Sequence, residues 1–155
     1  MNQKTMEMQV DAMMRVSGTQ SEKDREQIRR KLMKRHPPQN EVLTEAGIIL
    51  KELGIPGAVE NYSHAVQAIA MVVQDESLAD HITTVVYPRL AERFGVTQDR
   101  LRRSIWALIA VSCIKGDMDK LKYYFEDLIY RDSERPFDAE YILRLAREVR
   151  RRLKL

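Results

Sequence analysis

Apolar residues recur at spacings of three and four along most of the chain, which gathers them on one face of an α-helix. The segment 58–74 is the clearest example, because Val66, Ile69, Ala70 and Val73 share a face. The alternating pattern of β-strands is scarce. The sequence therefore predicts an all-α fold, with helices at about 4–16, 21–35, 41–53, 58–74, 77–86, 87–94, 98–114, 118–128 and 138–153.

Residues that begin or end helices lie at several of these boundaries. Ser21 can cap the helix that follows it, because its side-chain oxygen accepts a hydrogen bond from a free backbone N–H group. Gly54 suits the C-terminus of the third helix. Pro88 fits the first turn of a helix that starts at about Tyr87, because that turn needs no N–H donor.

The proline pair at 37–38 begins the best linker candidate in the chain, Pro-Pro-Gln-Asn. It predicts an N-terminal two-helix extension, residues 1–38, and a helical domain, residues 39–155. The chain has 155 residues, 44% of them hydrophobic, which is enough for one domain with a core and a short extra element. The net charge is only +3, but residues 1–40 hold nine Lys/Arg and five Asp/Glu.

Several classes of function lack support in the sequence. No apolar run approaches the ~20 residues that span a bilayer, and the first residues do not follow a signal-peptide pattern. With a single cysteine, these features predict a cytoplasmic protein without a membrane partner. The histidines at 36, 64 and 81 lack metal-ligand spacing, and no phosphate loop or catalytic group is evident. We expect no enzyme activity, no metal, no cofactor and no small-molecule substrate.

The stretch from Leu90 to Ile109 fits a helix-turn-helix motif, within a unit expected to span Val86 to Lys115. The motif needs a small residue in the first helix, a turn glycine, an apolar plug, a helix cap and two apolar residues that hold the second helix. These are supplied in order by Ala91, Gly95, Val96, Thr97 and the pair Leu101 and Ile105.

The second helix of this motif has an apolar side and a charged side when projected at ~100° per residue. The apolar side holds Leu101, Ile105, Leu108 and Ser112. The opposite side holds Asp99, Arg102, Arg103 and Trp106, with Arg100 on a flank. From Arg89 to Arg103 there are five arginines and two acids, a local basic patch. Such a helix can enter the major groove, where arginine binds guanine or phosphate. A solvated face, or a surface that binds protein, is the alternative interpretation.

At these residues the chain resembles the C-terminal effector domain of the stage-zero sporulation response regulator. The resemblance covers about Leu43 to Leu153, in the segments LKELGIPGAVENY, AIAMV, ITTVVYPRLAERFGVT, RLRRSIWALIAV and RPFDAEYILRLA. It implies a compact helix-turn-helix bundle of about six helices that binds tandem sites on double-stranded DNA as a head-to-tail dimer. Residues 1–40 are too short for the family's phosphorylatable receiver domain, so phosphorylation in cis is not expected.

The resemblance also implies which residues contact DNA. Arg100 and Arg103 match family arginines on the recognition helix, and Arg135 matches a basic residue near the DNA backbone. Thr97 and Gln98 lie at the helix start, where phosphate contacts cluster. With Arg102 and Trp106 from the outward side, the predicted DNA-binding set is Thr97, Gln98, Arg100, Arg102, Arg103, Trp106 and Arg135.

Three positions depart from the family pattern. Arg102 stands where the family has a base-reading Glu, Trp106 replaces an Arg, and Ala107 replaces a His. A carboxylate accepts from cytosine N4 and an arginine cannot, so we expect a changed sequence preference or weaker specific binding. The favoured hypothesis is a transcription regulator related to sporulation control. The alternative is a protein-interaction module, or an antagonist of a related regulator, that kept the fold and lost specific DNA binding.

Other residues are given mainly structural roles. Cys113 and the aromatic run 123–125 are expected to pack. The methionines at 6, 8, 13 and 14 make the first helix apolar, so it needs a partner surface, either this domain or a second chain as a homodimer or heterodimer. The run Arg150 to Arg152 could reach phosphates or stay solvated.

Overall fold

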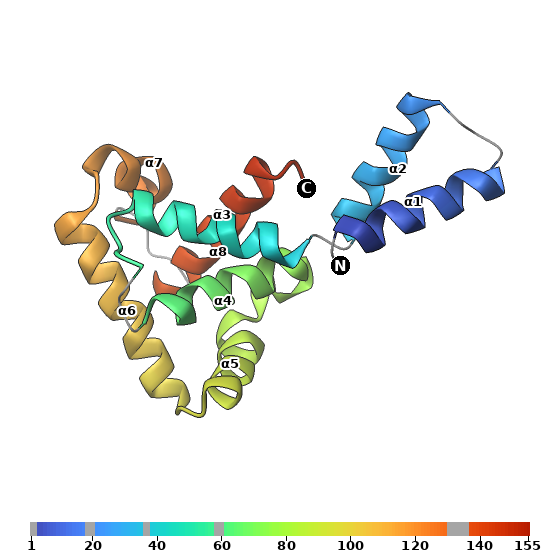
Figure 1. The fold of residues 1–155 in the computed structure, drawn as a ribbon. Coiled ribbons are helices and arrows are strands. Elements are labelled where there is room, and N and C mark those ends of the chain that lie inside the picture. Colours follow the sequence, from blue (N-terminus) through green and yellow to red (C-terminus); the bar gives the residue numbers. More distant parts are fainter. Residues whose placement is uncertain (1–2, 18–20, 36–37, 58–60, 130–136) are drawn as a thin grey trace.

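A computed structural model describes residues 3–17, 21–35, 38–57, 61–129 and 137–155 (Figure 1). Every regular element within these ranges is a helix, which confirms the predicted all-α class. In chain order the elements are α1 (Gln3–Ser17), α2 (Glu22–Arg35), α3 (Gln39–Glu52), α4 (Tyr62–Gln74), the 3-10 turn η1 (Glu76–Asp80), the π turn η2 (Ile82–Val86), α5 (Tyr87–Phe94), α6 (Gln98–Lys115), α7 (Met118–Ile129) and α8 (Phe137–Arg152).

Helix α4 lies at the centre of the main hydrophobic core. It packs most extensively against α3 and α8, and also contacts α5 and α6. A helix that is apolar on most sides is buried on most sides. Accordingly its buried residues surround the helix axis: Ala65, Val66, Ala68, Ile69, Ala70, Val72 and Val73. α8 closes this core with the buried residues Ile142, Leu145, Ala146 and Val149.

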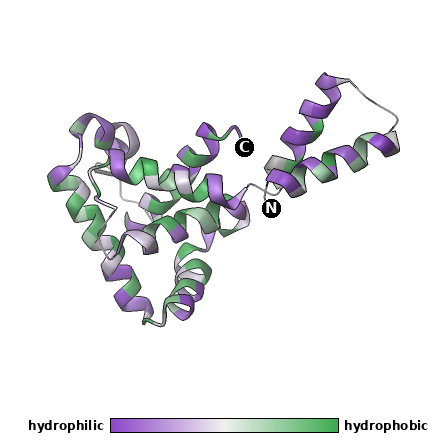
Figure 2. Cartoon of the chain, in the orientation of Figure 1, coloured by the Kyte–Doolittle hydropathy of each residue, from purple (hydrophilic) through white to green (hydrophobic). Residues whose placement is uncertain are grey.

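Helices α1 and α2 form a hairpin that stands apart from α3–α8 (Figure 1). Met6, Val10 and Met14 of α1 are buried against Leu32 and the half-buried Ile28 of α2. These residues form a hydrophobic cluster separate from the main core. Figure 2 shows α2 as mostly hydrophilic. The division of the chain at residue 38 stays a prediction.

The helix boundaries follow the predicted signals closely, with one exception. The hydroxyl of Ser21 accepts from the N–H of Asp24 at 3.1 Å, as a cap should. Residues 77–86 were predicted as an α-helix but form η1 and η2 instead. Pro88 explains part of this difference, because it has no N–H to donate to the carbonyl four residues earlier. In η2 the N–H of Val86 reaches back five residues, to His81 O at 3.2 Å.

The end of α3 meets the end of α6 backbone to backbone. Gly54 has φ 83°, and the N–H groups of Gly54 and Ile55 bond back to Lys51 O and Leu50 O, each at 3.0 Å. This is the left-handed helix ending that favours glycine. A Cβ atom on Gly54 would lie 2.8 Å from the backbone nitrogen of Gly116. Both positions therefore depend on the absence of a side chain.

Candidate DNA-binding surface

The turn between α5 and α6 has the geometry that the sequence predicts. Gly95 adopts the left-handed conformation, with φ 66° and ψ 34°. The N–H of Val96 bonds to Ala91 O at 3.0 Å, which closes α5. The hydroxyl of Thr97 accepts from the N–H of Arg100 at 3.1 Å, which begins α6. These local interactions fix the direction in which α6 leaves the turn.

The inner side of α6 is held by apolar packing. Leu101, Ile105, Leu108 and Ser112 are all buried, as the helical projection predicts. Ser104 adds a polar tie, because its hydroxyl lies 2.7 Å from the Nδ1 atom of His64 on α4. The His64 ring also lies 4.5 Å from that of Phe94 on α5. His64 therefore has the structural role expected of it.

The outer side of α6 exposes most of the predicted site. Thr97, Gln98, Arg100 and Arg103 are exposed on its first turns. Within the described ranges neither Arg100 nor Arg103 pairs with a carboxylate; Arg103 Nε donates to the backbone oxygen of Asp99 at 3.3 Å. Trp106 is 43% exposed and stacks on Phe137 of α8, with ring centroids 5.7 Å apart. Arg135 lies outside the described residues.

Arg102 is held by a contact with α8, whereas the helical projection predicts that its side chain points freely outward. Its Nη2 donates to Oδ1 of Asp138 at 3.2 Å, and its Nε lies 3.2 Å from Oδ2. Asp138 is fully buried and also accepts from the Tyr87 hydroxyl at 2.8 Å. Burial, followed by the nearby Asp138 carboxylate, raises the pKa of Tyr87. This cluster joins α5, α6 and α8. Sequence reasoning missed Asp138 and Tyr87, since nothing local indicates a contact across 36 residues.

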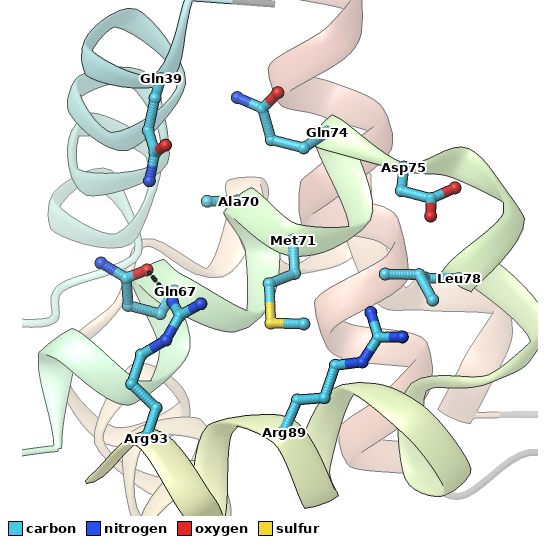
Figure 3. A pocket seen from close by; sticks show the side chains of 9 residues that line it. All are labelled: Gln39, Gln67, Ala70, Met71, Gln74, Asp75, Leu78, Arg89 and Arg93. Carbon is cyan, nitrogen blue, oxygen red and sulfur yellow. Dashed lines mark hydrogen bonds between the residues drawn. The ribbon is translucent and has the colours of Figure 1, made fainter.

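Two of the five arginines in the predicted patch face elsewhere. Figure 3 shows Arg89 and Arg93 rising from α5 toward α4, where they line a hollow of about 250 Å³. Arg93 Nη1 donates to the side-chain oxygen of Gln67 at 3.3 Å. The arginines on α6 are therefore the ones that define the candidate DNA-binding face, so the local patch is smaller than the sequence count indicates.

The basic end of α8 is occupied by contacts within the domain. Arg150 donates to Val73 O at 2.7 Å and pairs with Glu76 at 2.8 Å. Arg152 pairs with Glu52 at 2.7 Å, and its hydrogen bond lowers the pKa of that carboxyl group. These two arginines fasten α8 to its neighbours, which corrects the expectation that they stay solvated or reach phosphates.

Two further packing predictions are wrong in part. Cys113 is exposed, because the helical phase turns the neighbouring Ser112 inward instead. In the aromatic run, Tyr124 and Phe125 are buried, but Tyr123 is 71% exposed. Across the described residues, no group of three or more His, Cys, Asp or Glu side chains could hold a metal ion. No helix in the described part of the chain is long and apolar enough to cross a membrane.

A helix, a left-handed glycine turn and a capped second helix with a buried inner face together define a helix-turn-helix protein. The family model described as sporulation initiation factor Spo0A C terminal matches residues 47–149, which is more than half of the chain. The chain belongs to this family. It therefore carries a sporulation-related DNA-binding effector domain, from a regulatory family and not an enzyme family. The match begins within α3 and ends within α8.

Proposed function

We propose that this protein is a sequence-specific transcription regulator related to sporulation control, and that α6 reads the major groove of double-stranded DNA. The observation that supports this most is the state of Arg100 and Arg103. Both are exposed on the first turns of a helix whose opposite side is buried, and neither is neutralised by a carboxylate among the described residues. Arginines presented in this way can bind guanine edges or phosphates.

The remaining members of the predicted set take different parts. Thr97 and Gln98 lie at the N-terminus of α6, where the helix dipole and free N–H groups favour phosphate. Asp138 occupies the Nε and Nη2 sides of the Arg102 guanidinium. We therefore assign Arg102 chiefly to holding α6, with Nη1 left for DNA. Trp106 offers an apolar edge at the groove. A DNA contact by Arg135, and a head-to-tail dimer on tandem sites, stay predictions.

The test begins with selection of duplexes from a random library at physiological salt. The affinity for the enriched site is then measured by fluorescence anisotropy. Arg103→Ala should lose about 10- to 100-fold in affinity for that site and relax its selectivity. Arg147→Ala is the matched control, because it removes the same charge from an exposed residue of α8 that has no side-chain partner in the described ranges. Equal losses for the two variants would contradict the proposal.

A second candidate function, an antagonist that binds protein, is favoured by one observation. Trp106 is partly exposed and extends an aromatic surface with Phe137 on the face that should meet DNA. Exposed tryptophans are common at the centres of protein interfaces. This alternative predicts that the selection enriches no sequence, and that binding falls with salt in the same way for every duplex.

A further inference from the structure

The α1–α2 hairpin has too little core to be stable alone. Its buried apolar residues are Met6, Val10, Met14 and Leu32, with Ile28 partly buried. The helices contain 15 and 14 residues, near the length of ~12–15 below which isolated helices are marginal in water. Units of ~40 residues or fewer usually need a staple or an oligomer. The separation of this cluster from the main core means that the domain does not supply the missing surface.

Ion pairs decide which side of α1 faces α2. Arg25 bonds to Asp11 and lies 3.4 Å from Glu7, and Arg29 lies 2.6 Å from Glu7. Both acids of α1 are therefore directed toward α2. The opposite side of α1 keeps only uncharged residues between Lys4 and Arg15.

This outer side of α1 is an exposed apolar stripe. Met8 is 64% exposed and Met13 is 46% exposed, and Gln9 and Ala12 lie exposed between them. We define these four residues as the α1 stripe. Exposed methionines on an uncharged stripe are typical of a surface that is covered by a partner.

The charges of the hairpin indicate a second copy of this chain as that partner. The exposed side of α2 is charged along its length, with Lys23, Arg30 and Lys31 beside Glu22 and Glu26, so covering it would remove these charges from water. The α1 stripe has no charge to repel. In an antiparallel pair of α1 helices, Met8 faces Met13 of the second copy and Gln9 faces Ala12 of the second copy. The stripe is thus complementary to itself about a twofold axis.

We propose that the α1 stripe is a homodimer interface, in which two hairpins associate through antiparallel α1 helices to form a four-helix bundle. The bundle buries the methionines of both copies and leaves the charged sides of both α2 helices in water. A parallel pair is disfavoured because it would align Lys4 with Lys4 and Arg15 with Arg15. This proposal deepens the proposed function, because the role of the dimer in DNA binding rests on that function. Joining two α6 helices lets one protein engage two half-sites with a raised effective concentration.

The test measures self-association of the full chain without DNA, so its outcome does not depend on the proposed function. Sedimentation equilibrium should give twice the monomer mass for the wild type. Met8→Glu/Met13→Glu should give a monomer, because it places charges at the centre of the interface. Gln27→Glu is the control, since it adds an acid to an exposed position of α2 and should leave the dimer intact. A wild-type monomer at all concentrations would overturn the proposal.

Cross-linking keeps the proposal testable if the glutamate variant unfolds the hairpin. In a Cys113→Ser background, a mixture of Gln9→Cys chains and Ala12→Cys chains should form disulfides between the two variants, because position 9 faces position 12 of the second copy only in the antiparallel pair. Failure to cross-link in a stable dimer would place the interface elsewhere and overturn the proposal. In DNA binding, the monomeric variant should keep its affinity for a single half-site and lose about 100-fold or more for paired sites. If the wild type does not bind a single half-site, that result would instead count against the proposed function.

Discussion

Replacing Arg102 with alanine removes the cation that contacts the Asp138 carboxylate within the described residues. Breaking a fully buried ion pair costs about 3–5 kcal/mol, because the remaining charge is left uncompensated. Here Asp138 is fully buried, but the Arg102 side chain is 43% exposed, so solvent already screens part of the attraction. The Tyr87 hydroxyl also continues to donate to Asp138. We therefore expect Arg102→Ala to lower the free energy of unfolding by about 1–3 kcal/mol.

The sign of the charge at position 102 provides a sharper check than the size of the loss in unfolding free energy. Arg102→Glu places a second carboxylate beside buried Asp138. It should therefore destabilise the protein more than Arg102→Ala does. Arg102→Ala/Asp138→Asn should be more stable than Arg102→Ala, because the buried amide needs no cation.

Urea unfolding followed by circular dichroism measures these differences, with Trp106 fluorescence as a local probe beside the cluster. Arg103→Ala is the control for removing an arginine from α6, since its guanidinium has no carboxylate partner in the part of the chain that is described. It should change stability by less than ~0.5 kcal/mol. If Arg102→Ala is equally neutral, or if adding Asp138→Asn makes that variant less stable, the contact between Arg102 and Asp138 does not stabilise the fold.

Three further predictions concern backbone strain and pH. Gly95→Ala should lower the free energy of unfolding by about 1 kcal/mol, from its left-handed conformation alone, since nothing lies within 4 Å of the new Cβ. Gly54→Ala should lower it by about 2–4 kcal/mol, because its Cβ also meets backbone atoms at 2.8 Å. Equal losses in urea titrations would contradict this difference. The pKa of Glu52 is lowered by Arg152, so the unfolding free energy should fall as pH decreases below about 4.5, and Glu52→Gln should weaken that fall in an acid titration. Burial raises the pKa of Tyr141 to about 12, so the unfolding free energy should fall as pH rises above 10, where the phenol of the unfolded chain ionises. Tyr141→Phe should reduce the slope of unfolding free energy against pH between pH 10 and 12. An unchanged slope would show that this phenol is not responsible.

The sequence predicts those parts of the fold that depend on neighbouring residues. The turn at Gly95 and the cap at Thr97 need only a few consecutive residues of the right type, and both have the expected geometry. The buried side of α6 follows from helical periodicity for the same reason. The same projection puts Ser112 on the buried side and Cys113 ~100° further around the helix, so the exposure of Cys113 follows from the phase of α6 and not from its residue type.

Contacts between distant segments could not be predicted in this way. The partner of Arg102 lies on α8, and Arg150 bonds to a backbone oxygen of α4. The directions of Arg89 and Arg93 depend on the crossing of α5 over α4, which no local pattern specifies. Counting arginines along the sequence therefore overestimates the charge available to DNA, because the packing decides which guanidinium groups remain free.

The close approach of Gly54 and Gly116 bears on how this domain can diverge. A Cβ on Gly116 would fall 2.6 Å from the carbonyl oxygen of Leu53, so neither chain segment leaves room for even a methyl group. The C-terminal end of α6 therefore packs against the end of α3 through backbone atoms, which every amino acid has. Exposed residues of α6 can therefore be substituted without changing this backbone contact. The exposed residues at the start of α6 can accordingly change while the direction of the helix in the domain stays the same.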